Sequence, residues 1–215
     1  MKLYFVRHGK TLSNLEGRFQ GSTIDSQLLP QAYDELSLLG QELRHIKFDE
    51  VYSSDLPRAL KSAEIILDEN KHTYTIQATK QLREWYLGSL EGTKISIAKA
   101  IYPKQIRAFN HNLAQFSPSI FDAETLYQVT HRIIDVIQSL NEKNENILIV
   151  GHGASLSATI HCLLGYEPSA FKKLGHLDNT SLTILETSNL KEFHLVKWNN
   201  TEHLEKAQET LIISN

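Results

Sequence analysis

Continuous apolar stretches alternate with helical patterns along this chain. Residues 3–6 and 147–150 are wholly apolar, which is typical of strands buried on both faces of a sheet. Four further strands are expected, the last two as an antiparallel pair, at residues 50–53, 74–78, 180–186 and 192–198. These strands predict a sheet of which at least two members lie deep in the core.

Apolar positions three and four residues apart predict helices between the strands. The clearest helical patterns cover residues 36–46, 56–67, 123–140 and 156–164. Residues 22–37 are polar and include Pro30, so this segment is expected to be irregular, and Ser54 and Asp55 are candidate N-caps for the next helix. The alternation of strands and helices predicts an α/β fold.

The size and composition fit one domain. The chain has 215 residues and 24.5 kDa, without an evident linker, so we expect a domain at residues 1–199 and an extension at 200–215. A net charge of −3 argues against a nucleic-acid partner bound through overall charge. A single cysteine, no apolar run of membrane-spanning length and no basic leader predict a cytoplasmic protein without a membrane partner.

Both buried strands end in a histidine–glycine pair. Arg7-His8-Gly9 follows the first strand and Gly151-His152-Gly153 follows the second. If the strands are parallel neighbours, both imidazoles emerge at the same sheet edge, where open α/β sheets bind ligands. Arg7 and Arg58 can reach this point and, with helix N-termini, would form a pocket for an anion such as a phosphoryl group. Arg58 alone fits a solvated surface residue equally well.

Four segments in this order resemble the histidine phosphatase superfamily, which has the phosphoglycerate mutase-like fold. They are residues 7–9, 53–59, 82–92 and 151–153, and residues 18–21 and 25–26 resemble a loop of the same family. The resemblance spans residues 2–198. It implies a three-layer sandwich in which helices flank a mixed, mostly parallel central sheet.

The resemblance also implies catalytic roles. His8 would be the nucleophile that forms a phosphohistidine, and Glu84 would be the general acid and base. Arg7, Arg58 and His152 would hold the three non-bridging oxygens. Further phosphate or substrate contacts would come from Asn14, Gln20, Gly21, Gly153 and Asn179. No metal and no cofactor are expected, and a backbone carbonyl is expected to fix the tautomer of His8.

Some positions leave alternatives open. Glu91 lies in the same loop as Glu84 and could be the acid, although a structural or capping role fits it better. Lys10 stands where the family more often has Glu or Gln, and it either adds positive potential or points to solvent. His176 could reach the pocket. Residues 22–37 also form a longer loop than the family's compact one.

The predicted activity is that of a phosphoric monoester hydrolase of the histidine acid-type phosphatases. The interval between Glu84 and His152 is short, which leaves little room for the covering insertion of the family's mutases. Two alternatives are a cofactor-dependent phosphoglycerate mutase and a catalytically weak binding or scaffold protein. A serine hydrolase is not favoured, because no Gly-x-Ser-x-Gly motif occurs. The expected partner is a small phosphorylated substrate, bound by a monomer or dimer.

Overall fold

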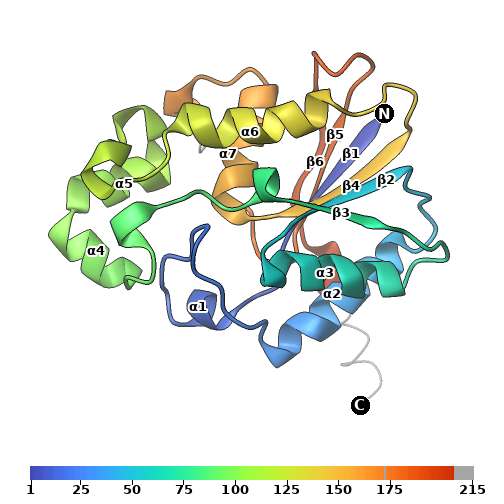
Figure 1. Ribbon diagram of the computed structural model, residues 1–215, viewed down its shortest axis with the longest axis horizontal. Coiled ribbons are helices and arrows are strands. Elements are labelled where there is room, and N and C mark those ends of the chain that lie inside the picture. Colours follow the sequence, from blue (N-terminus) through green and yellow to red (C-terminus); the bar gives the residue numbers. More distant parts are fainter. Residues whose placement is uncertain (172, 206–215) are drawn as a thin grey trace.

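A six-stranded sheet forms the centre of the protein (Figure 1). The computed structural model describes residues 1–171 and 173–205. The strands are β1 (Lys2–Arg7), β2 (Glu50–Ser54), β3 (Ile76–Thr79), β4 (Asn146–Gly151), β5 (Leu182–Glu186) and β6 (His194–Asn200). In the order β3-β2-β4-β1-β5-β6, the first four strands are parallel, while β5 runs antiparallel to β1 and β6 antiparallel to β5. The predicted α/β fold with a mostly parallel sheet and a closing antiparallel pair is confirmed.

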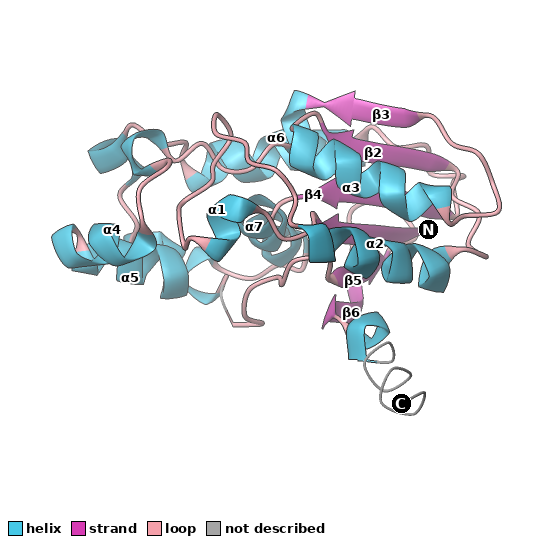
Figure 2. Cartoon of the chain, turned by 90° about the horizontal axis from the view of Figure 1, so that it is seen from below, coloured by secondary structure: helices cyan, strands magenta, loops and turns pink. Residues whose placement is uncertain are grey.

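Helices cover both faces of this sheet. The α-helices are α1 (Leu12–Leu15), α2 (Pro30–Leu43), α3 (Pro57–Asp68), α4 (Ile95–Ile101), α5 (Pro103–His111), α6 (Leu126–Gln138) and α7 (Gly153–Leu163). Short 3-10 helices occupy Lys80–Leu82, Gly88–Leu90, Leu113–Gln115, Pro118–Phe121 and Pro168–Ala170. Helices α2 and α3 lie on one face and α6 and α7 on the other (Figure 2). The result is the expected three-layer sandwich.

Alternate residues of β1 point into two separate cores. Tyr4 and Val6 pack with α2 and α3, whereas Leu3 and Phe5 pack with α6 and α7. The same alternation holds along β4, because successive side chains of a strand point to opposite faces. Both faces are covered, which explains why the two strands are apolar at every position.

The expectation of an irregular segment at residues 22–37 is wrong in its second half. Helix α2 begins at Pro30, with Leu29 as an N-cap that makes no side-chain capping bond. Proline suits this position, since its fixed φ matches the helix and its missing N–H would lack a helical partner there. Leu36 and Leu39, both buried, continue the apolar stripe of the helix. In its N-terminal turn the stripe continues through the buried Ala32, whose small side chain the prediction did not include.

The predicted N-caps of α3 are also wrong. The N-cap is Leu56, which has no side-chain capping bond. Ser54 Oγ accepts from the Leu56 N–H at 3.3 Å, and Asp55 forms an ion pair with Arg83 instead. Here Pro57 at the first helical position fixes the start of the helix.

Helices α4 and α5 form a lobe beyond the carboxyl ends of the parallel strands (Figure 1). The lobe is built on a third core whose aromatic members are Phe19, Trp85, Phe109, Phe116, Phe121 and Phe171. Trp85 and Phe109 meet edge to face, with ring centroids 5.5 Å apart, a favourable arrangement for aromatic pairs. The lobe therefore fixes the loop that contains Trp85 and its neighbour Glu84.

The C-terminal part of the sheet ends close to the expected domain boundary. Strand β6 continues to Asn200, one residue past the expected boundary at residue 199. Of the extension at 200–215, residues 206–215 lie outside the described residues. Within the described part of the chain, no helix is long and apolar enough to cross a membrane.

Candidate active site

The two histidine–glycine pairs meet at one edge of the sheet. Strands β1 and β4 are parallel neighbours whose register pairs Arg7 with Gly151. The residue after each partner is a histidine, and the rings of His8 and His152 lie with centroids 5.1 Å apart. The proximity predicted from the strand ends is therefore present in the structure.

His8 is held in one tautomer by its own backbone. Its Nδ1 lies 2.7 Å from the carbonyl oxygen of Gly9, and it must carry the proton to donate to that oxygen. The lone pair then resides on Nε2, as a nucleophilic imidazole requires. Burial lowers the pKa of His8 well below its ordinary value, and the positive charges of Arg58 and Arg7 lower it further. His8 is thus neutral at neutral pH.

Arg7 lies across the end of β1 and holds the segment before β5. Its Nη1 donates to the carbonyl oxygen of Leu177 at 2.5 Å. A Cβ atom on Gly153 would come within 2.9 Å of the Arg7 Nε, so only glycine leaves room for this guanidinium. The close approach explains a glycine at the start of α7.

Arg58 is buried, so the alternative of a solvated surface residue is wrong. Its side chain is fully enclosed and forms an ion pair with Asp25 at 2.6 Å. Nη1 also donates to the Ile24 carbonyl at 3.0 Å, and Nη2 donates to the Gly21 carbonyl at 2.9 Å. The positive charge of Arg58 at the N-terminus of α3 is therefore stabilised by the loop that contains Gly21, Ile24 and Asp25.

His152 is oriented by the end of the neighbouring strand. Its Nε2 lies 2.8 Å from Ser54 Oγ, and this hydroxyl also accepts from the Leu56 N–H. Burial lowers the pKa of His152 well below its ordinary value, and the charges of Arg58, His8, Arg7 and Arg132 add to this. The neutral ring can accept a hydrogen bond from the Ser54 hydroxyl at Nε2, which leaves the proton of the ring on Nδ1.

Three buried nitrogens at this edge have no hydrogen-bond partner among the described residues. They are Arg7 Nε, Arg58 Nε and His152 Nδ1. Buried polar groups of this kind are rare and call for an explanation, since each costs about 1–3 kcal/mol when unsatisfied. They belong to the same three residues that the family resemblance assigns to the non-bridging oxygens of a phosphoryl group.

Glu84 lies at the N-terminus of α7. Its carboxylate accepts from the backbone N–H groups of Ala154 at 2.9 Å and Ser155 at 2.7 Å, and from the N–H of Trp85 at 2.8 Å. Free N–H groups at a helix N-terminus are a favourable site for an acidic group. The contacts fix the carboxylate beside Gly153, next to the histidine pair.

Glu91 has a different environment. It accepts from the backbone N–H groups of Ser22 at 3.0 Å, Thr23 at 3.0 Å and Leu87 at 3.1 Å, and from the Thr23 hydroxyl. These bonds join two loops that are distant in sequence. The structural role expected for Glu91 fits this arrangement.

A cavity of about 300 Å³ opens at this edge of the sheet. Among the predicted site residues it is lined by Arg7, His8, Asn14, Gln20, Glu84 and Gly153. Four predicted residues lie outside this lining: Arg58, His152, Gly21 and Asn179. Gly21 contributes its carbonyl to Arg58, and Asn179 donates to the carbonyl of His8 at 3.0 Å and to Asn14 at 3.2 Å.

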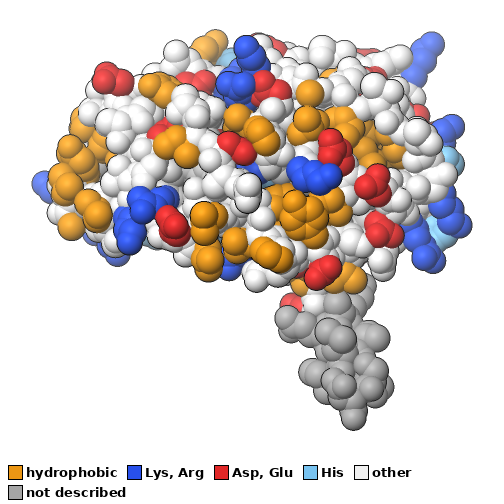
Figure 3. All heavy atoms as spheres, turned by 60° about the horizontal axis from the view of Figure 1, so that its bottom comes forward, with side chains coloured by type: hydrophobic (Ala, Val, Ile, Leu, Met, Phe, Trp, Pro, Cys, Tyr) orange, Lys and Arg blue, Asp and Glu red, His pale blue; other side chains and the backbone are white. Residues whose placement is uncertain are grey.

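The cavity has further walls that sequence reasoning did not assign. They are Arg18, Phe19, Leu87, Ile95, Phe109, Asn110, Ala154 and Leu177, and His176 lines the cavity as considered from the sequence. Ile95 is 38% exposed, and other exposed hydrophobic residues of α4 continue from it. Figure 3 shows that hydrophobic side chains lie in groups between charged ones on the lower face of the molecule. Arg18, Phe19 and Leu87 had a signal, because they fall within the segments 18–21 and 82–92 that resemble the family.

Lys10 lies outside the lining of this cavity. Burial raises the pKa of Glu35 on α2, and the charge of the nearby Lys10 opposes this rise. The positive charge of Lys10 therefore acts on Glu35, while both alternatives for its side chain stay predictions.

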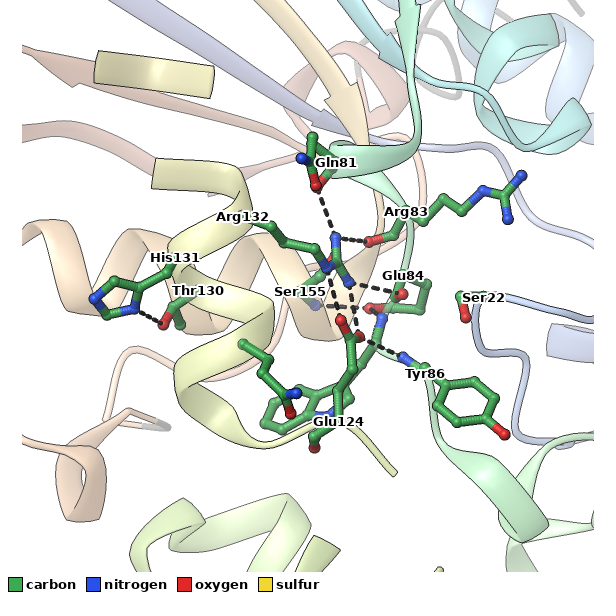
Figure 4. A network of polar contacts seen from close by, with 12 residues as sticks. Ser22, Gln81, Arg83, Glu84, Tyr86, Glu124, Thr130, His131, Arg132 and Ser155 are labelled. Carbon is green, nitrogen blue, oxygen red and sulfur yellow. Dashed lines mark hydrogen bonds and ion pairs between the residues drawn. The ribbon is translucent and has the colours of Figure 1, made fainter. Parts of the chain in front are cut away.

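Behind Glu84, an ion pair holds the backbone of the loop (Figure 4). Arg132 of α6 contacts Glu124 at 3.0 Å, and it donates to the carbonyl oxygens of Gln81, Arg83 and Glu84. Neither member of this pair was among the residues predicted from the sequence. Both lie far from the motifs along the chain, so no local pattern reveals them.

The sheet order and the paired histidines define an α/β protein of the phosphoglycerate mutase-like fold. The chain belongs to the histidine phosphatase superfamily (branch 1), whose family description matches residues 3–201. It is 30% identical over 208 residues to the broad-specificity phosphatase YOR283W of Saccharomyces cerevisiae, covering 95% of this chain and 87% of that protein. It is also 30% identical over 181 residues to a 2,3-bisphosphoglycerate-dependent phosphoglycerate mutase of Cytophaga hutchinsonii, covering 82% of each.

Solved structures agree with this assignment. The structure of Bacillus stearothermophilus YhfR superimposes with a TM-score of 0.85 at 27% identity, covering 94% of this chain and 98% of that one. The family relation and the fold predicted from the sequence are confirmed. Because the relatives include both phosphatases and mutases, the reaction has to be argued from the site.

Proposed function

We propose that this protein is a metal-independent phosphomonoester hydrolase that works through a phosphohistidine at His8. The observation that carries the proposal is the set of three unsatisfied nitrogens, on Arg7, Arg58 and His152, around a neutral His8. A phosphoryl group offers three non-bridging oxygens that can accept from such donors. Donors already in place where charge develops are the main source of catalysis in phosphoryl transfer.

The proposed reaction has two steps. Nε2 of His8 attacks phosphorus, the bond to the ester oxygen breaks, and Glu84 gives its proton to the departing alcohol. Water then attacks the phosphohistidine and gives a proton to Glu84, the phosphorus–nitrogen bond breaks, and inorganic phosphate leaves. Both steps use the same carboxyl group in opposite directions, which its position beside Gly153 supports.

We favour hydrolysis over mutase chemistry. A mutase must protect the phosphohistidine from water until the acceptor is in place. The short interval between Glu84 and His152 leaves few residues for a segment that could cover the site. The apolar wall formed by Phe19, Leu87 and Phe109 suits a small phosphate ester with a partly apolar organic group. A cytoplasmic location and a monomeric or dimeric state stay predictions.

One assay tests the reaction class. Purified protein given 3-phosphoglycerate with a 2,3-bisphosphoglycerate primer should release inorganic phosphate, whereas rapid isomerisation without release would show a mutase. Hydrolysis of p-nitrophenyl phosphate should continue in EDTA and be lost in His8→Ala. Equal, negligible rates for the wild type and this variant would favour a binding or scaffold protein instead.

A second assay tests the intermediate. Brief mixing with ³²P-labelled phosphate ester and acid-free denaturation should leave label on the wild type, in a form stable to alkali and released by mild acid, as phosphohistidine is. His8→Ala should carry no label, and His152→Ala should still carry some. Label that survives in His8→Ala would overturn the assignment of the nucleophile.

A further inference from the structure

We infer that Arg132 and Glu124 are positioning residues for the acid Glu84. The inference rests on the proposed function, in which Glu84 protonates the leaving group. Neither residue lines the cavity. The Arg132 guanidinium bonds to carbonyl oxygens of the loop and to the Glu124 carboxylate. Their effect is exerted through the backbone of the loop at residues 81–86.

Arg132 holds one side of this loop. Its Nη1 donates to the carbonyl oxygens of Gln81 and Arg83, each at 2.7 Å, and its Nη2 donates to that of Glu84 at 3.0 Å. The planar guanidinium presents these donors in a fixed geometry, which an ammonium group cannot reproduce. Two of its three bonds fall on Glu84 and the residue before it, so Arg132 fixes the peptide from which the catalytic carboxylate extends.

Glu124 holds the next two residues of the loop. Its carboxylate accepts from the Tyr86 N–H at 2.9 Å, and its carbonyl accepts from Trp85 Nε1 at 2.7 Å. Its own N–H donates to the Tyr86 carbonyl at 2.9 Å. The same carboxylate binds Arg132 through both oxygens, each at 3.0 Å, so the two residues act as one unit (Figure 4).

The front of Glu84 is fixed by a different element. Its carboxylate accepts from the N–H groups of Ala154 and Ser155 at the start of α7, while Arg132 belongs to α6. The acid is thus clamped between two helices, one at the side chain and one at the backbone. A shift of the backbone would move the carboxylate relative to the leaving oxygen, and an error of about 1 Å in such geometry costs on the order of 10² in rate.

The test compares two esters of similar size that need the acid to different degrees. The p-nitrophenolate ion leaves readily without a proton, while the phenolate from phenyl phosphate benefits more from protonation. The quantity to measure is kcat/KM, because it includes only steps up to formation of the phosphoenzyme, in which the leaving group departs. Phosphate release reports both reactions.

Arg132→Lys keeps the positive charge near His152 and removes the planar guanidinium that bonds to the loop. We expect kcat/KM for phenyl phosphate to fall about tenfold more than that for p-nitrophenyl phosphate, in the same direction as in Glu84→Gln. Glu124→Gln provides a second, milder variant that carries the test if Arg132→Lys fails to fold. Ile137→Val, which loosens the packing of the same helix and removes no hydrogen bond of the loop, should change kcat/KM for both substrates equally.

The outcomes separate the two proposals. If Glu84→Gln shows no selectivity between the esters, then Glu84 is not the acid, and both the proposed function and this inference are wrong on that point. If Glu84→Gln is selective while the folded Arg132 and Glu124 variants lose both activities in equal proportion, or keep them, only the positioning role is overturned.

Discussion

Arg7 and Gly151 face each other at the last position of the parallel pair formed by β1 and β4. The next residue in each strand is a histidine, so this one register position brings the rings of His8 and His152 to 5.1 Å. A slip by a single residue would point one of the two side chains to the opposite face of the sheet. The site therefore depends on strand pairing that the apolar cores on both faces enforce.

The low pKa of His8 predicts how activity changes with pH. Burial and the charges of Arg58 and Arg7 lower this pKa, so the nucleophile stays neutral below pH 6.5, the ordinary pKa of histidine. Corrected for ionisation of the ester, kcat/KM for p-nitrophenyl phosphate should show its acid limb well below pH 6.5. Removal of a positive charge in Arg58→Gln should raise the pKa of His8 and move this limb upward. A wild-type limb at 6.5 would contradict this account.

The same two histidines predict the pH dependence of stability. The folded-state pKa values of His8 and His152 are lowered, so below about pH 6.5 the unfolded chain binds protons that the folded protein does not. The free energy of unfolding should fall as pH decreases from there, by about 1.4 kcal/mol per pH unit for each histidine, down to its folded pKa. Urea titrations between pH 7.5 and 5 measure this slope.

The control for this slope is His8→Gln, which has no titratable group at residue 8. Its slope between pH 6.5 and 5 should be smaller than that of the wild type by the contribution of one histidine. An identical slope in both proteins would mean that His8 does not contribute to the loss of stability.

Glu84 and Glu91 should respond differently to the same substitution. Glu84→Gln should lower kcat/KM for phenyl phosphate by about 10²-fold or more, the range typical of general acids. Glu91→Gln replaces the carboxylate that accepts hydrogen bonds from the N–H groups of Ser22, Thr23 and Leu87. This substitution should lower the free energy of unfolding by about 1–3 kcal/mol. Chemical denaturation and steady-state kinetics on both variants check this. A catalytic loss in Glu91→Gln that discriminates between the two esters would make Glu91 the acid.

Gly153→Ala tests the close approach of Arg7 to the start of α7. The added Cβ would lie 2.9 Å from the Arg7 Nε and would displace the guanidinium from its place beside the phosphate site. We expect kcat/KM to fall about tenfold or more, while the melting temperature changes little because alanine suits a helix. Ala158→Gly, further along the same helix and outside the cavity lining, is the control for kcat/KM. Unchanged kinetics in Gly153→Ala would show that Arg7 does not need this space.

Local patterns were sufficient for much of the fold. The wholly apolar strands β1 and β4 and the apolar stripe of α3 were predictable because burial on both faces, or on one, leaves a regular spacing in the sequence. The start of α2 at Pro30 was not, because the buried residue of its first turn is the small Ala32, which gives a weak apolar signal. Arg58 was ambiguous for a related reason, since its ion pair with Asp25 depends on how a distant loop folds back.

The sequence by itself determined the family, the two histidine–glycine strand ends and the choice of Glu84 and Arg58 as candidates, because these are short segments in a fixed order. Tertiary structure alone decided that His152 is oriented by Ser54, that Arg58 is buried, and that Arg132 and Glu124 hold the loop of Glu84. Each of these contacts joins elements that are remote along the chain. Such contacts follow from packing and strand order rather than from local spacing, so no pattern in the sequence could indicate them.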